Sequence, residues 1–139
     1  MSAPRPYAAA IERLKRHRLR PTRQRLALVK LLFEKGDRHL SADQLHDEAK
    51  TAGIRVSLAT VYNTLNQFTS AGLLREVVVE SGRAYFDTNV SDHHHFLVAE
   101  TGELVDIPAH DIALGRLPEP PPGTAIERVD VIVRLGKRN

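Results

Sequence analysis

The segment SLATVYNTLNQFTSAGLLREVVVESGRAYFDT, residues 57–88, decides the fold, because the spacing of its hydrophobic residues changes partway through. Apolar residues first recur at helical spacing up to Phe68, and Gly72 ends this pattern as a C-terminal glycine does. Two runs rich in β-branched and aromatic residues follow, on either side of a turn signal at residues 80–83. A helix followed at once by a hairpin predicts a winged helix, in which the hairpin is a wing beside the recognition helix.

Helix signals also precede this segment. Thr22 is a predicted N-cap before an apolar stripe that stops at Gly36. Ser41, followed three residues later by Gln44, forms a capping-box pattern. Together with an amphipathic stretch at residues 9–18, these signals predict a four-helix bundle that leads into the wing.

The pattern changes again after residue 88. Two β-rich runs joined through Thr101 and Gly102 predict a second hairpin. A short helical piece at residues 109–117, a proline-rich break and a strand with alternating apolar residues from Val129 to Leu135 complete the chain. The sequence therefore predicts an α+β protein with a winged helix-turn-helix domain at 1–88, a linker at 89–92 and a small C-terminal α/β domain at 93–139.

The composition limits the chemistry that the chain can perform. Of its 139 residues, 42% are hydrophobic and 27% are charged, as in ordinary globular proteins. No apolar run is long enough to cross a bilayer and no signal-peptide core is visible, so we expect a cytoplasmic protein. The absence of cysteine excludes disulfides, thiolate zinc sites and cysteine nucleophiles. Any metal ion must therefore be bound by histidine, aspartate or glutamate.

Positive charge is concentrated in the first half of the chain. Residues 1–80 contain 14 Lys and Arg against 8 Asp and Glu, whereas residues 81–139 contain 6 against 9. No acidic residue lies between Glu12 and Glu34, an interval that holds eight basic ones. A solvated face usually mixes the two signs, so this run favours contact with nucleic-acid phosphates. Its candidate DNA-binding residues are Arg20, Arg23 and Arg25.

The helix that begins at Ser57 is the candidate for reading bases, because the N-terminal part of a recognition helix meets base edges. The candidate DNA-binding residues in this part are Ser57, Thr60, Tyr62 and Asn63. Asn63 suits adenine, and the methyl group of Thr60 suits thymine. Tyr62 is placed to reach a base or a phosphate. The ordinary alternative is a solvated Asn63 and a partly buried Tyr62.

Three consecutive histidines open the second half, in the stretch SDHHHFLVAETGELVDIP. Side chains alternate along a strand, so His93 and His95 share one face while His94 points to the other. A His-x-His pair on a strand is a two-ligand chelate whose further ligands come from elsewhere. We predict that His39 and Asp87 supply them, so that occupancy of the site sets the angle between the two halves.

The same histidines allow two further interpretations. His94 defines a candidate second metal site, with Asp92 or Asp130 as its acidic partner. Because imidazole also binds haem iron axially, His93, His94 and His95 are candidate haem ligands as well. The ordinary alternative for such a run is a polar loop at the start of a strand.

Two other functional classes compete with a sensor that binds DNA. Histidine and aspartate around a metal ion can activate water, so a metal-dependent hydrolytic enzyme is one alternative. A structural nucleic-acid-binding protein without a sensing role is another. The chain has no nucleophile motif and no phosphate-binding loop, so we do not expect an enzyme.

These stretches resemble the ferric uptake regulator (Fur) family of metal-responsive transcription factors. The similarity runs from about Leu14 to Gly136 and rests on LRPTRQRLALVKLL, HLSADQL, SLATVYNTLNQF, AGLL and DHHHFLVAETGELVDIP. The triple histidine and the absence of cysteine pairs are similar to the iron response regulator (Irr) branch of the family. The resemblance implies a homodimer with winged-helix domains and a C-terminal dimerisation domain, bound to A/T-rich palindromic operators in double-stranded DNA.

The resemblance also implies roles for single residues. Arg25 matches an arginine that contacts DNA, and Tyr62 matches the tyrosine of the recognition helix. In the Irr branch the histidine run implies haem binding that relieves DNA binding. The regulatory site of the family, which takes Fe(II), Mn(II) or Zn(II), falls on His39, Asp87, His93 and His95.

The chain also departs from the family pattern. Val98 and Thr101 stand in the positions of a Cys-x-x-Cys pair, so no cysteine-based structural zinc is expected. Ala113 and Asp130 stand where the second metal site of the family has a glutamate and a histidine. We therefore expect an iron- or haem-responsive transcriptional regulator, with a regulator that senses a bare divalent metal ion as the alternative.

Overall fold

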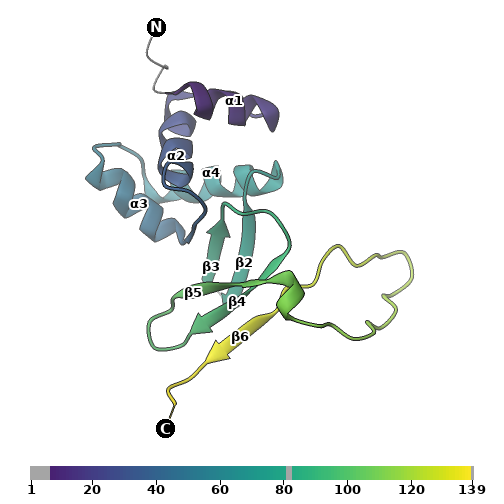
Figure 1. Ribbon diagram of the computed structural model, residues 1–139. Helices are drawn as coiled ribbons and strands as arrows, with labels where there is room; N and C mark the ends of the chain where they lie inside the picture. The colour runs from purple at the N-terminus through teal and green to yellow at the C-terminus, as the bar shows by residue number, and fades with distance from the viewer. Residues whose placement is uncertain (1–6, 81–82, 139) are drawn as a thin grey trace, which may run out of the picture. The chain divides into compact units, whose positions relative to one another are not determined.

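The computed structural model describes residues 7–80 and 83–138, and the chain divides into two compact units, residues 1–90 and 91–139. Figure 1 shows a helical part followed by strands in the first unit, and a small sheet with a long connection in the second. The elements of the first unit are α1 (Ala8–Arg16), α2 (Arg23–Phe33), β1 (His39–Leu40), α3 (Ala42–Thr51), α4 (Leu58–Ser70), β2 (Arg75–Glu80) and β3 (Arg83–Asp87).

The three predicted N-caps are present. The Thr22 hydroxyl accepts a hydrogen bond from the Arg25 N–H at 3.2 Å. Ser41 forms both bonds of a capping box with Gln44, at 2.8 and 3.2 Å, and the Ser57 hydroxyl accepts from a backbone N–H three residues later. Each cap satisfies a backbone donor that would otherwise lack a partner, and contributes about 1 kcal/mol. The helix starts are therefore determined locally.

The helices enclose one apolar core in the first unit. Leu28 and Leu32 of α2 are fully buried there, together with Leu45 of α3. Helix α4 contributes Leu65 and Phe68, both completely inaccessible to solvent. Because the apolar face of α4 is fixed inward, its opposite face is directed to solvent.

The wing is a three-stranded antiparallel sheet in the order β1-β3-β2. Strands β2 and β3 pair as the predicted hairpin, although its turn at residues 81–82 lies outside the described residues. The short strand β1, which the sequence pattern does not predict, pairs with β3 and places His39 opposite Asp87. This pairing brings two predicted metal ligands to neighbouring strands.

An ion pair ties the segment before β1 to helix α3. Arg38 donates from its two Nη atoms to the two carboxylate oxygens of Glu48, the first bond measuring 2.8 Å. The backbone N–H of Arg38 donates to the Thr88 hydroxyl at 2.8 Å. The hydrogen bonds from Arg38 hold the pKa of Glu48 below its ordinary value, against a smaller opposing effect of burial. The pair is partly exposed, so its contribution to stability is modest.

Replacement Glu48→Gln is expected to lower the free energy of unfolding at neutral pH by up to about 1 kcal/mol. A carboxylate with a lowered pKa stabilises the fold above its unfolded-state pKa and loses this effect as the pH falls through the folded-state pKa. The difference from the wild type should therefore shrink in acid, which urea unfolding at several pH values measures. Asp47→Asn, at an exposed neighbouring position of α3, is the control, and an equal effect of both variants would contradict the role of the pair.

The second unit contains β4 (His93–Val98), β5 (Leu104–Pro108), the single 3₁₀ turn η1 (Ala109–Asp111) and β6 (Ile132–Leu135). Its sheet has the order β5-β4-β6, with β4 antiparallel to β5 and parallel to β6. The second hairpin and the last strand are thus confirmed. The helical piece predicted at residues 109–117 is reduced to η1, because Gly115 disfavours a helix and Pro118 restricts the residue before it. Among the described residues, no helix combines the length and apolar character needed to cross a bilayer.

Candidate functional site

Strand β4 begins with the three consecutive histidines, and all three are buried. His93, His94 and His95 expose only 5%, 7% and 2% of their surface. Pairing with β5 on one side and β6 on the other holds the backbone extended. The side chains therefore alternate, with His93 and His95 on one face of the sheet and His94 on the other.

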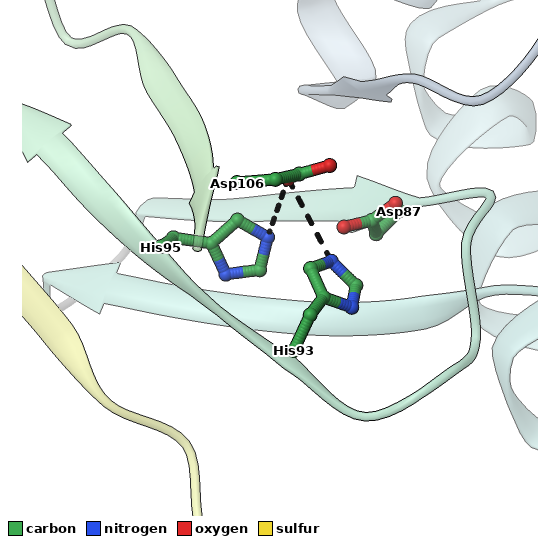
Figure 2. A group of neighbouring side chains, drawn as sticks. All are labelled: Asp87, His93, His95 and Asp106. Atoms are coloured by element: carbon green, nitrogen blue, oxygen red, sulfur yellow. Dashed lines mark ion pairs between the residues drawn. The ribbon is translucent and has the colours of Figure 1, made fainter. Parts of the chain in front are cut away.

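An aspartate on the neighbouring strand faces the first and third histidines. The Oδ1 atom of Asp106 lies 3.7 Å from Nε2 of His93 and 3.4 Å from Nε2 of His95. The two imidazole rings meet edge to face, with their centroids 4.6 Å apart. Figure 2 shows both rings directed at the Asp106 carboxylate. Two nitrogen donors and one oxygen donor thus converge within 4.8 Å of one another.

These separations suit a shared metal ion better than hydrogen bonds. A hydrogen bond between such groups measures about 2.7–3.2 Å, so both contacts are too long. Ligand atoms that each lie about 2.0–2.2 Å from one tetrahedral ion are about 3.3–3.6 Å from one another. The observed 3.4 Å falls within this range, and 3.7 Å lies just above it.

A hydrogen bond at Nδ1 of His93 orients the ring so that Nε2 faces Asp106. The Nδ1 atom lies 2.7 Å from the backbone carbonyl oxygen of Ser91, which can only accept, so Nδ1 carries the proton. In the neutral ring the lone pair is then on Nε2, the atom that faces Asp106. Histidines that bind metals are commonly oriented in this way by an acceptor for the other ring nitrogen.

His94 has a different partner. Its Nδ1 atom accepts a hydrogen bond from the backbone N–H of Val131 at 3.1 Å, just before β6. Asp130 accepts from Nε of Arg128 at 2.8 Å, and Asp92 is exposed. Within the part of the chain that the structure describes, His94, Asp92 and Asp130 are not gathered into a cluster of metal ligands.

Asp106 is a candidate ligand that the sequence reasoning missed. A turn centred on Thr101 and Gly102 would place Pro108 opposite His95, whereas the observed register places Asp106 there. The loop between the two strands is longer than a two-residue turn, since the last paired residues are Leu97 and Leu104. The loop is centred between Glu100 and Thr101, one position earlier than predicted, and this shift changes the residue opposite His95 by two positions.

The other two predicted ligands lie in the first unit, on adjacent strands. His39 is half-buried, and Asp87 exposes 1% of its surface. They are direct cross-strand partners, so their side chains share a face of the sheet. Oδ1 of Asp87 accepts from the backbone N–H of Asn89 at 2.9 Å, and buried Arg75 is its partner on the opposite strand.

The predicted base-reading residues lie at the start of α4. Tyr62 is 41% exposed, and Asn63 is also exposed. The hydroxyl of Ser57 accepts from the Thr60 N–H and donates to the Thr60 hydroxyl at 2.9 Å. Ser57 and Thr60 therefore stabilise the helix end, while Tyr62 and Asn63 present free surface.

Of the predicted phosphate-binding residues, Arg20 and Arg23 are exposed and Arg25 is held in place. Nη1 of Arg25 donates to the Arg20 carbonyl at 2.9 Å, and Nη2 donates to Oε1 of Gln67 at 2.8 Å. Sequence reasoning missed Gln67, because it is 42 positions away and only the packing of α2 near α4 brings the two together.

Comparisons with known proteins place the sequence in a family. Residues 16–116 match the sequence model of the ferric uptake regulator family. The chain is 34% identical to the ferric uptake regulation protein of Shigella flexneri over 94 residues, which are 67% of this chain and 64% of that one. With the Pseudomonas aeruginosa protein the identity is 35%, over 67% and 70% of the two chains. The alignment thus spans just under two thirds of the first relative.

Two solved structures show the same fold. The ferric uptake regulator of Pseudomonas aeruginosa, described with manganese, superimposes with a TM-score of 0.69 at 24% identity, over 92% of this chain and 97% of that one. The Vibrio cholerae regulator gives a TM-score of 0.71 at 23% identity, over 93% and 99%. The α+β architecture predicted from the sequence is therefore confirmed.

Proposed function

The chain belongs to the ferric uptake regulator family, and from this premise we propose that it is a transcriptional regulator whose affinity for double-stranded DNA depends on a divalent metal ion. The observation that carries the proposal is the convergence of His93, His95 and Asp106 at separations that suit one ion. The exposed face of α4 and the arginines before it supply the DNA-binding surface. Family membership disfavours the hydrolytic alternative.

We propose that His39 and Asp87 complete the ligand set. Both are predicted from the sequence, and both lie on one face of the wing sheet. Asp87 precedes His93 by six residues, so the chain keeps their Cα atoms within about 22 Å whatever the conformation of the linker. An ion bound by ligands from both units would restrict their relative motion, and so favour one orientation of the DNA-binding unit.

A bare ion fits the candidate site better than haem. The Asp106 carboxylate faces both Nε2 atoms, which favours a small ion over the wide, flat porphyrin of haem. Imidazole with carboxylate suits Mn(II), Fe(II) and Zn(II). In His94, the third haem candidate, Nδ1 accepts the N–H of Val131, so Nε2 of the neutral ring carries the proton and offers no lone pair to haem iron.

Four further proposals rest on the sequence: the branch of the family, the oligomeric state, the location in the cell and the type of operator. The triple histidine and the absence of cysteine favour the iron response regulator branch, and we propose a homodimer that acts in the cytoplasm on A/T-rich palindromic operators. A dimer presents two copies of α4, which suits two operator half-sites that are one turn of the DNA double helix apart.

The proposed function predicts that Mn(II) raises the affinity for an A/T-rich palindromic duplex by about tenfold or more, a typical coupling between two ligands. Fluorescence anisotropy of a labelled duplex measures this, with protein in Mn(II), in EDTA and in haem. A scrambled duplex controls for binding to phosphates alone. Affinity that responds to haem and not to Mn(II) would contradict the proposal of a bare ion, and indifference to both would contradict sensing.

A further inference from the structure

The first turn of α2 carries positively charged side chains, which are unfavourable at the N-terminus of a helix. Its N-terminal residues include Arg23 and Arg25, and no acidic residue. The N-terminus of a helix has a partial positive charge, so two arginines there are unfavourable unless an anion lies nearby. Local arrangements that cost stability are commonly retained for function.

Arg25 is nevertheless held in one orientation by neutral partners. Its backbone N–H is bound by the Thr22 hydroxyl. Its guanidinium donates to the carbonyl of Arg20 and to the side-chain oxygen of Gln67. None of these partners is a carboxylate, so the positive charge is positioned without being neutralised. Of the five guanidinium N–H donors, two are used by these bonds and three remain for an anion.

A shallow groove beside Arg25, wide open to solvent, gives an anion access to the guanidinium. It has a volume of about 580 Å³ and is lined by Leu19, Arg25, Asn66, Gln67, Ser70 and Ala71. A guanidinium only donates, so the amide oxygen of Gln67 must face Arg25 and its NH₂ group is directed elsewhere. Amide and hydroxyl donors thus accompany the fixed cation, as in sites that bind phosphate oxygens.

We propose that Gln67 is a positioning residue, which holds the Arg25 guanidinium so that it binds a phosphate of the DNA backbone in this groove. The inference rests on the proposed function and deepens it. It adds a backbone contact at the C-terminal half of α4 to the base contacts at its N-terminal end. A glutamine suits this task, because a carboxylate at the same position would neutralise the arginine and repel the phosphate.

Gln67→Ala is expected to weaken binding of the Mn(II)-loaded, full-length protein to the palindromic duplex about three- to tenfold, since Arg25 must then be ordered upon binding. The dependence of affinity on salt should keep its slope, because no charge is lost. Arg25→Ala should instead reduce that slope by about one unit. The double variant should bind no more weakly than Arg25→Ala, and Gln67→Glu should bind more weakly than Gln67→Ala.

Anisotropy titrations between low and moderate salt measure these effects, with thermal unfolding to verify the fold. Thr51→Ala, at an exposed position at the end of α3 and outside this groove, is the control and should change affinity less than twofold. Wild-type affinity in Gln67→Ala, or additive losses in the double variant, would overturn the role of Gln67 while DNA binding stands. Absence of duplex binding by the wild type would overturn the proposed function together with this inference.

Discussion

Replacing His95 by alanine is expected to weaken Mn(II) binding by more than about 100-fold. Loss of a group that merely orients a ligand already costs about 10- to 100-fold in metal affinity, and His95 is placed to be a ligand itself. Nε2 of His95 lies 3.4 Å from Oδ1 of Asp106 and is nearer to it than Nε2 of His93, at 3.7 Å. Competition with a fluorescent chelator measures the affinity, and the response of DNA binding to Mn(II) should disappear with it.

Two histidines provide controls for this variant. His110 is exposed and outside the cluster, so His110→Ala should bind Mn(II) as the wild type does. His94→Ala removes the acceptor of the Val131 N–H and should reduce stability more than metal affinity. Undiminished Mn(II) affinity in His95→Ala would refute the assignment of the site.

Replacing Phe68 by alanine is expected to lower the free energy of unfolding of the first unit by about 3–5 kcal/mol. Phe68 is completely buried at the centre of the helical core, so truncation leaves a cavity that the neighbouring leucines cannot fill. Urea unfolding followed by circular dichroism measures the change. DNA binding should be lost wherever this unit is unfolded.

Tyr62→Ala on the same helix is the matched control for Phe68→Ala. Tyr62 is 41% exposed, so its removal should change stability far less while still weakening DNA binding. A large loss of stability in Tyr62→Ala, or a small one in Phe68→Ala, would show that α4 packs in another orientation.

The helix starts and the apolar face of α4 could be predicted, because the residues that determine them are close together in the sequence. The caps at Thr22, Ser41 and Ser57 depend on residues three positions apart, and the apolar face of α4 depends on helical spacing alone. Alternation along a strand likewise separates His94 from His93 and His95. Each of these features follows from a few neighbouring residues.

The unpredicted features depend on pairing between distant segments. Strand β1 has only two residues and exists because β3 offers it a partner. Asp106 lies opposite His95 because the loop between β4 and β5 is centred between Glu100 and Thr101. Gln67 meets Arg25 only after α2 and α4 have packed. Such contacts are determined by tertiary packing, and the local sequence contains no signal for them.

The most direct test of the account is a crystal structure of the protein with Mn(II), with diffraction data that locate the ion by its anomalous signal. We expect one anomalous peak within about 2.5 Å of Nε2 of His93, Nε2 of His95 and a carboxylate oxygen of Asp106. Asp87 and His39 are expected to complete the coordination. A peak that lies elsewhere, with these side chains uncoordinated, would contradict the central claim.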